Sequence, residues 1–63
     1  MGDNYKEYLR GYIDANKNIL NMLRKHKERQ NPTEYNAICV YNFLIILVND
    51  IIKELEEEYN DEQ

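Results

Sequence analysis

The chain of 63 residues carries a formal net charge of −4 and is long enough for one small domain only. One Cys and one His exclude a disulfide framework and a four-ligand zinc site within a single chain. The absence of Ser excludes Ser-based nucleophilic catalysis as well.

The first residues, MGDNYKEY, are charged and contain no apolar stretch, which predicts that no secretory signal is present. A lone Cys is typical of a reducing compartment, so we expect a cytoplasmic protein. Asn, Ile, Tyr and Lys, whose codons are AT-rich, are abundant. This bias indicates an AT-rich bacterial, phage or viral genome.

The first predicted element is a helix over residues 5–29. Asn4 is a suitable N-cap and Glu7 follows three residues later, as in a capping box. Apolar residues recur at alternating steps of three and four, which is a helical period. This stripe comprises Tyr5, Tyr8, Tyr12, Ala15, Ile19 and Met22, and it is widened by Leu9, Ile13, Leu20 and Leu23. We therefore expect the Tyr rings to lie in the core of a helical pair.

The only Pro of the chain marks the boundary to the next element. Asn31 is a candidate N-cap, Pro32 suits the first helical position, and Glu34 completes a capping box. These residues predict a second helix over residues 32–59. The short connection makes the two helices antiparallel neighbours. We expect residues 60–63 to form a frayed acidic tail.

The second helix has the strongest periodic pattern. A heptad seam runs along it through Ile38, Tyr41, Ile45, Val48, Ile52, Leu55 and Tyr59. A second apolar row lies beside this seam, formed by Ala37, Val40, Leu44, Leu47 and Ile51, and a third flank holds Cys39, Phe43 and Ile46. A helix that is apolar on most of its circumference must be buried, and one neighbouring helix covers only one side of it.

A second copy is the simplest cover for the remaining sides. The prediction is an all-α fold, a two-helix antiparallel hairpin that dimerises into a four-helix bundle. The residues expected at the oligomer interface are Ile38, Tyr41, Leu44, Ile45, Val48, Ile52 and Leu55. A place in a larger hetero-complex, with another protein over the second helix, satisfies the same need. No membrane span is expected, because the apolar run 37–48 is shorter than the about 20 residues that a bilayer requires.

Charge is unevenly distributed, with +3 on residues 1–32 and −7 on residues 33–63. The basic cluster that ends the first helix is a candidate nucleic-acid contact and comprises Arg24, Lys25, Lys27 and Arg29. The acidic end of the second helix is a candidate protein-docking surface, because acid steers a cationic partner and Tyr supplies contact area. Its predicted residues are Tyr5, Tyr8, Glu54, Glu57, Glu58, Tyr59 and Asp61.

The sequence contains no Gly-rich phosphate loop, EF-hand loop or HExxH motif, so we expect no enzymatic activity, metal or cofactor. Cys39 lies in the apolar run, where we expect it to be buried and unreactive. The leading expectation is a small regulator, inhibitor or adaptor that acts by protein–protein binding. In length and predicted shape the chain resembles the plasmid-encoded Rop hairpin proteins, dimeric four-helix bundles that bind RNA pairs, although it shares no residue motif with them. This resemblance implies RNA binding through the basic cluster as the alternative.

Overall fold

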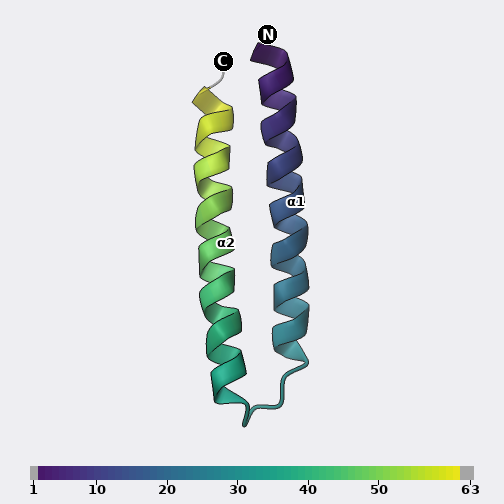
Figure 1. The fold of residues 1–63 in the computed structure, drawn as a ribbon, viewed down its shortest axis with the longest axis vertical. Coiled ribbons are helices and arrows are strands. Elements are labelled where there is room, and N and C mark those ends of the chain that lie inside the picture. Colours follow the sequence, from purple (N-terminus) through teal and green to yellow (C-terminus); the bar gives the residue numbers. More distant parts are fainter. Residues whose placement is uncertain (1, 62–63) are drawn as a thin grey trace.

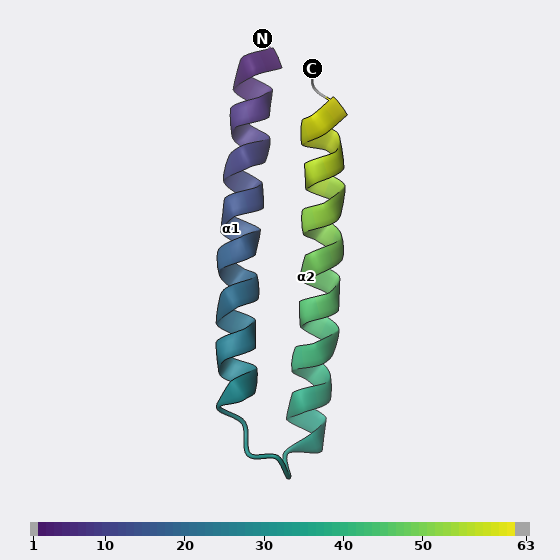
Figure 2. The same cartoon turned by 180° about the vertical axis from the view of Figure 1, so that it is seen from behind.

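The computed structural model describes residues 2–61, and it describes the side chains of residues 4–61. Two helices, α1 (Gly2–Glu28) and α2 (Tyr35–Asp61), pack side by side as an antiparallel hairpin (Figure 1). They run alongside each other over nearly their full length when the hairpin is seen from behind as well (Figure 2). The hairpin measures 51 × 14 × 10 Å. The predicted all-helical hairpin is confirmed.

Helix α1 begins earlier than the sequence predicts. It starts at Gly2, so Asn4 lies inside the first turn, and its prediction as the N-cap is wrong. At the other end, the amides of Arg29 and Gln30 donate to carbonyls of the last turn, and the Gln30 side-chain amide donates to the His26 carbonyl. These bonds satisfy carbonyls that the end of a helix otherwise leaves unpaired.

The connection contains a turn where the sequence predicts the first turn of α2. The Glu34 amide donates to the Asn31 carbonyl at 2.8 Å, and the Asn31 side chain accepts from the Thr33 amide and hydroxyl. Pro32 follows Asn31 in this turn, where its fixed φ is favourable. The first helical bond of α2 runs from the Ile38 amide to the Glu34 carbonyl, so Glu34 occupies the N-cap position and not Asn31. The predicted capping box is therefore a β-turn.

Helix α2 continues through Asn60 and Asp61, which the sequence assigns to a frayed tail; residues 62–63 lie outside the described range. The last turn of α2 contains no basic residue of its own to stabilise its negative end. Lys6 and Arg10 of α1 lie close to this end instead, and both contact Tyr59. The antiparallel neighbour therefore supplies the positive charge that α2 lacks.

The seam of α2 faces α1, as its heptad spacing indicates. Ile52 is buried, and the other six members of the heptad seam are half-buried. On α1 the buried side chains are Leu9, Ile13 and Leu20, with Leu23 half-buried. The fully buried part of the hairpin core is thus aliphatic, and the half-buried Tyr41 and Tyr59 lie along the same line between the helices.

The expectation that the Tyr rings of α1 fill this core is wrong. Tyr5, Tyr8 and Tyr12 are exposed, as are Ile19 and Met22 on the same stripe. The Leu and Ile row next to the stripe packs on α2 instead. Aliphatic side chains fill a narrow helix–helix contact without a polar atom, whereas a buried Tyr hydroxyl requires a hydrogen-bond partner. The apolar stripe of α1 does lie on one side of the helix, but that side is next to the seam and does not contact α2 within it.

Candidate interaction surface

The hairpin has two broad faces, one on each side of the seam. One of them is apolar over much of its length and includes side chains from both helices. The Tyr5 hydroxyl donates to Glu58, and this contact joins α1 and α2 on that side. Residues seven positions apart share one side of a helix, so the rows that continue from Tyr5 and Glu58 lie on this face too. We call it the apolar face; it comprises Tyr5, Tyr8, Tyr12, Ala15, Ile19 and Met22 of α1 and Ala37, Val40, Leu44, Leu47 and Ile51 of α2.

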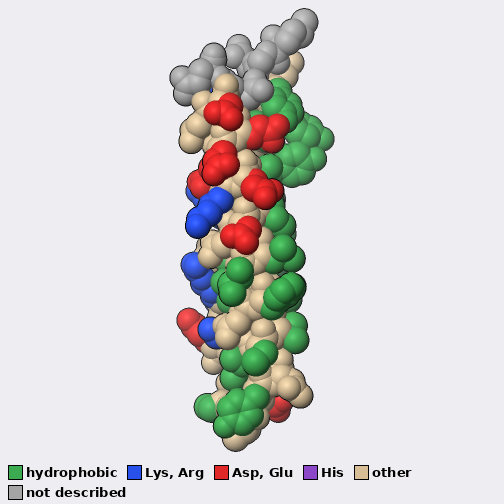
Figure 3. Space-filling view, turned by 90° about the vertical axis from the view of Figure 1, so that its left-hand side faces the viewer, with side chains coloured by type: hydrophobic (Ala, Val, Ile, Leu, Met, Phe, Trp, Pro, Cys, Tyr) green, Lys and Arg blue, Asp and Glu red, His purple; other side chains and the backbone are tan. Residues whose placement is uncertain are grey.

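The opposite face is polar. Lys17 Nζ lies 3.5 Å from a Glu56 carboxylate oxygen, which joins the two helices on this side. The seven-residue repeats through these two positions place charged and amide side chains along both helices. We call this the polar face; it comprises Arg10, Lys17 and Arg24 of α1 and Asn42, Asn49 and Glu56 of α2. Viewed from the α2 side, hydrophobic side chains follow one edge of the hairpin and Lys and Arg the other (Figure 3).

Side chains on the apolar face are well exposed within the hairpin. Met22 of α1 is 58% exposed and Val40 of α2 is 57% exposed, whereas Leu9 of the seam is 3% exposed. Among the described large hydrophobic side chains, the exposed ones off this face are Tyr35, Phe43 and Ile46. A continuous apolar surface of this kind is typical of an interaction site.

The seven residues predicted at the oligomer interface lie mainly on the α1-facing side of α2. Ile52 is buried, and Ile38, Tyr41, Leu44, Ile45, Val48 and Leu55 are half-buried. These side chains are already used in the hairpin contact, and of the seven Leu44 belongs to the apolar face. Their part in an oligomer stays a prediction. The exposed apolar surface comes from the neighbouring row of α2 and from the Tyr-bearing stripe of α1. The sequence interpretation assigned that stripe of α1 to the hairpin core.

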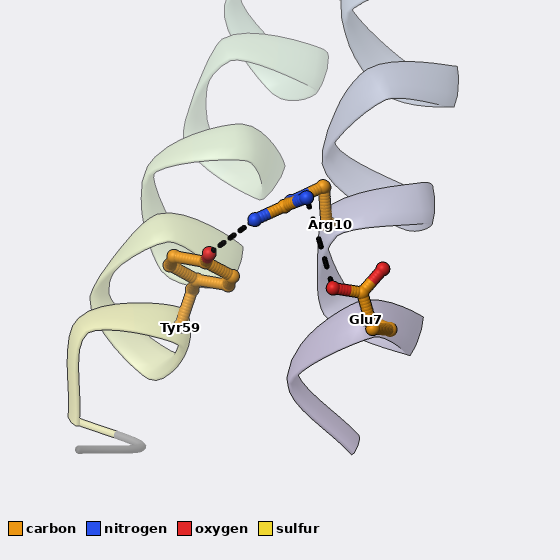
Figure 4. A network of polar contacts seen from close by, with 3 residues as sticks. All are labelled: Glu7, Arg10 and Tyr59. Atoms are coloured by element: carbon orange, nitrogen blue, oxygen red, sulfur yellow. Dashed lines mark hydrogen bonds and ion pairs between the residues drawn. The ribbon is translucent and has the colours of Figure 1, made fainter. Parts of the chain in front are cut away.

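The predicted protein-docking residues gather at the open end of the hairpin, where the two chain ends lie. Tyr59 is held there by α1, because Arg10 donates to its hydroxyl at 3.1 Å (Figure 4). Lys6 Nζ also lies 4.7 Å from the Tyr59 ring centroid. The hydrogen bond to Tyr59 and the nearby Glu7 carboxylate, 3.7 Å away, raise the pKa of Arg10. At the same end of α2, Glu54, Glu57 and Asp61 are exposed.

Tyr8 and Tyr12 form a pair on the outer side of α1. Their rings meet edge to face with centroids 5.0 Å apart, and the Tyr12 hydroxyl donates to the Tyr8 hydroxyl at 3.4 Å. This hydrogen bond raises the pKa of Tyr12. Glu7, Gly11 and the two rings line a shallow hollow of about 370 Å³. The pair contributes a large aromatic surface to the apolar face at its open end.

Two members of the basic cluster share a groove near the turn. Arg24 and Lys27 line this groove of about 570 Å³, together with Glu28, Asn42, Ile45 and Ile46. Lys25 and Arg29 are exposed but do not line the groove. The Glu28 carboxylate therefore lies beside two of the four predicted nucleic-acid residues, and a role of the cluster in nucleic-acid binding stays a prediction.

Cys39 is exposed, so its predicted burial is wrong. The His26 ring stacks near-parallel with Tyr41 at a centroid distance of 6.4 Å. Within the described part of the chain, no group of three His, Cys, Asp or Glu side chains is placed to hold a metal ion.

Helix α2 is long and apolar enough to cross a membrane by length and composition. Its best 18-residue window has a mean hydropathy of 1.6, and 11% of that window is buried in the hairpin. The sequence interpretation considered only the length of the uninterrupted run 37–48 and therefore expected no membrane span. The hydropathy average includes the Asn and Asp residues and still remains high. The low burial of α2 shows again that the hairpin leaves much of this helix exposed.

Comparison with known proteins finds no match, whether among protein families, curated proteins or solved structures.

Proposed function

We propose that this protein is a small non-enzymatic interaction module that associates with a second copy of itself through the apolar face. The observation on which the proposal rests is the exposure of one continuous apolar surface contributed by both helices. As a cytoplasmic regulator, inhibitor or adaptor, it would then bind a protein target with the acidic open end.

The energetics of the hairpin favour a covered apolar face. In the described chain four hydrophobic side chains are buried, Leu9, Ile13, Leu20 and Ile52. A domain of about 60 residues buries only about 60% of its unfolded surface and is marginal even when it is compact. Burial of an exposed Leu, Ile, Val or Met side chain contributes about 1.5–3 kcal/mol. Association through this face would therefore add stability that a lone hairpin lacks.

A second copy suits this surface better than a bilayer does. The apolar side chains of α1 and α2 lie on the same face, so a second hairpin laid against it covers both rows at once, as in a four-helix bundle. A membrane-spanning α2 would instead place Asn42, Asn49 and Asp50 in hydrocarbon, away from water. It would also leave the apolar row of α1 uncovered.

The target surface proposed for the bundle is the acidic open end. Glu54, Glu57 and Asp61 are exposed on the last turns of α2, where Lys6 and Arg10 of α1 hold Tyr59. Exposed carboxylates and a Tyr at one end of the hairpin are suited to a basic protein, because the acid speeds encounter and the ring supplies contact area.

Two adjacent residues of α2 provide a matched test of self-association. Leu47 lies on the apolar face, whereas Ile46 points to the other side and lines the groove with Arg24 and Lys27. Both are exposed in the hairpin, so either can become Glu without burying a charge in the seam. We expect wild type and Ile46→Glu to elute as dimers and Leu47→Glu as a helical monomer, with the mass taken from light scattering and the fold from circular dichroism.

Other outcomes would redirect the assignment. A dimer that survives Leu47→Glu unchanged would reject the apolar face as the interface. A wild-type chain that stays monomeric would reject self-association and favour a different protein as the partner of α2. A chain that partitions into lipid vesicles or detergent would also reject self-association and favour a membrane instead. Nucleic acid that co-elutes at low salt and is lost at high salt would support the basic cluster as the functional site.

A further inference from the structure

The apolar rows of the two helices are staggered along the apolar face. On α1 the row runs from Tyr5, near the open end, to Met22 and is followed by His26, while the basic cluster lies at the end of the helix and just beyond it, near the turn. On α2 the row runs from Ala37 to Ile51, near the turn, and then continues into Glu54, Glu58 and Asp61. The turn end of the hairpin is therefore basic, and the apolar face has an acidic corner on α2 at the open end.

Two copies can pack through this face with twofold symmetry in two ways. In a turn-to-turn alignment, the two turns lie at the same end of the bundle, and α1 of one copy covers α2 of the other. In a head-to-tail alignment, the turn of one copy lies over the open end of the other, and each helix covers its own equivalent. The stagger prevents full overlap of the apolar rows in either case, and the overlap is similar in both. Apolar contact alone does not distinguish them.

Charge does distinguish the two alignments. Turn-to-turn packing gathers the acidic corners of both copies at one end of the bundle and both basic turns at the other, so each end concentrates like charge. Head-to-tail packing places the acidic corner of each copy at the same end as the basic turn of its partner. Opposite charges favour an alignment, whereas like charges gathered together disfavour it.

We propose that the protein forms a head-to-tail dimer, in which Glu54, Glu58 and Asp61 of each copy lie at the same end of the bundle as the basic cluster of the other. This inference rests on the proposed self-association and specifies its geometry. Each end of the four-helix bundle then carries one acidic open end and one basic turn. The bundle presents two equivalent target-binding surfaces about 40 Å apart, from the 1.5 Å rise per helical residue.

Distances between spin labels distinguish the alignments. Cys39 is the sole cysteine and is exposed, so Cys39→Ala supplies a background without a reactive thiol. Asn36→Cys in that background places a nitroxide at an exposed, uncharged position near the turn. From the helical rise, we expect about 40 Å between the two labels in a head-to-tail dimer and roughly 20 Å in a turn-to-turn dimer. A main distance near 40 Å by pulsed electron paramagnetic resonance is the expected result, and one near 20 Å would overturn the head-to-tail alignment.

A second label position separates failure of the alignment from failure of self-association. Asn18 is exposed near the middle of α1, where the two copies lie at the same level in both alignments. Asn18→Cys in the Cys39→Ala background should therefore give a distance below about 30 Å whichever way the copies run. Absence of an intermolecular signal from Asn18→Cys, together with a monomeric mass by light scattering, would overturn the proposed self-association itself.

Discussion

The apolar and polar faces flank the same seam, yet they differ in how well their exposed side chains are satisfied in the lone hairpin. On the polar face, Lys17 and Glu56 meet across the helices at 3.5 Å and remain about half exposed, so water completes their solvation. On the apolar face, side chains such as Met22 and Val40 are as exposed as these charges. A polar side chain is satisfied by solvent, whereas an apolar side chain is not. The seam thus holds the two helices together, and of its two flanks the apolar one is left exposed by the hairpin.

The largest effect is expected in the seam. Ile52→Ala removes a buried side chain between the helices and should lower the free energy of unfolding by about 2–5 kcal/mol. The neighbouring Ile51 lies on the apolar face and is the matched control. Urea unfolding at several protein concentrations should show a large loss for Ile52→Ala at every concentration. Ile51 is 37% exposed in the hairpin, so Ile51→Ala should show a smaller loss in dilute protein that grows where copies associate. Equal losses for both variants in dilute protein would show that a seam residue contributes no more to the free energy of unfolding of the hairpin than a residue of the apolar face.

A smaller gain is expected on the back of α1. Gly11 lies within the helix, and a Cβ at this position would meet no atom within 4 Å. Gly11→Ala should raise the free energy of unfolding by roughly 0.5–1 kcal/mol, because Ala loses less backbone freedom in a helix. Gly11 borders the hollow beside Tyr8 and Tyr12, and one added methyl group there should leave the mass from light scattering unchanged. A loss of the dimer would show that a partner copy approaches this part of α1 closely and that Gly11 belongs to the dimer interface.

The smallest effect is a shift in titration at the open end of the apolar face. The Tyr12 hydroxyl must be protonated to donate to Tyr8, so the fold favours the protonated form and raises its pKa above the ordinary value of 10.0. This stabilisation is present below pH 10 and is lost as the pH rises through the raised pKa. Tyr8→Phe should bring the Tyr12 pKa down toward 10.0 in a pH titration followed by NMR. Tyr35→Phe, at the far end of the hairpin, should leave it unchanged, and an equal shift in both variants would contradict the assigned hydrogen bond.

The sequence was most informative for α2, where one heptad seam dominates. Its members, from Ile38 to Tyr59, face α1 as their spacing predicts, because a continuous 3-4 pattern defines one side of a helix. In α1 two adjacent rows have the same period. One contains Tyr5, Tyr8 and Tyr12, and the other contains Leu9, Ile13 and Leu20. Periodicity alone did not show which row enters the core, and the more aromatic row proved to be the exposed one.

The turn was misread for a related reason. Asn31, Pro32 and Glu34 fit the start of a helix and a β-turn equally well, since both place a side-chain oxygen and a fixed proline φ at the same spacing. Only the position of α2 against α1 distinguishes the two. Residues 29–34 are used to cross from one helix to the other, and the first helical bond therefore begins at Glu34.

The sequence by itself determined the helical period, the single reversal near Pro32 and the separation of basic and acidic charge along the chain. These are local properties, set by side-chain spacing, backbone restriction and composition. Only the tertiary structure decided which row of α1 packs on α2, and hence that the remaining apolar rows of both helices share one face. Register between two helices depends on how side chains of both interdigitate at close range, and neither helix contains that information alone.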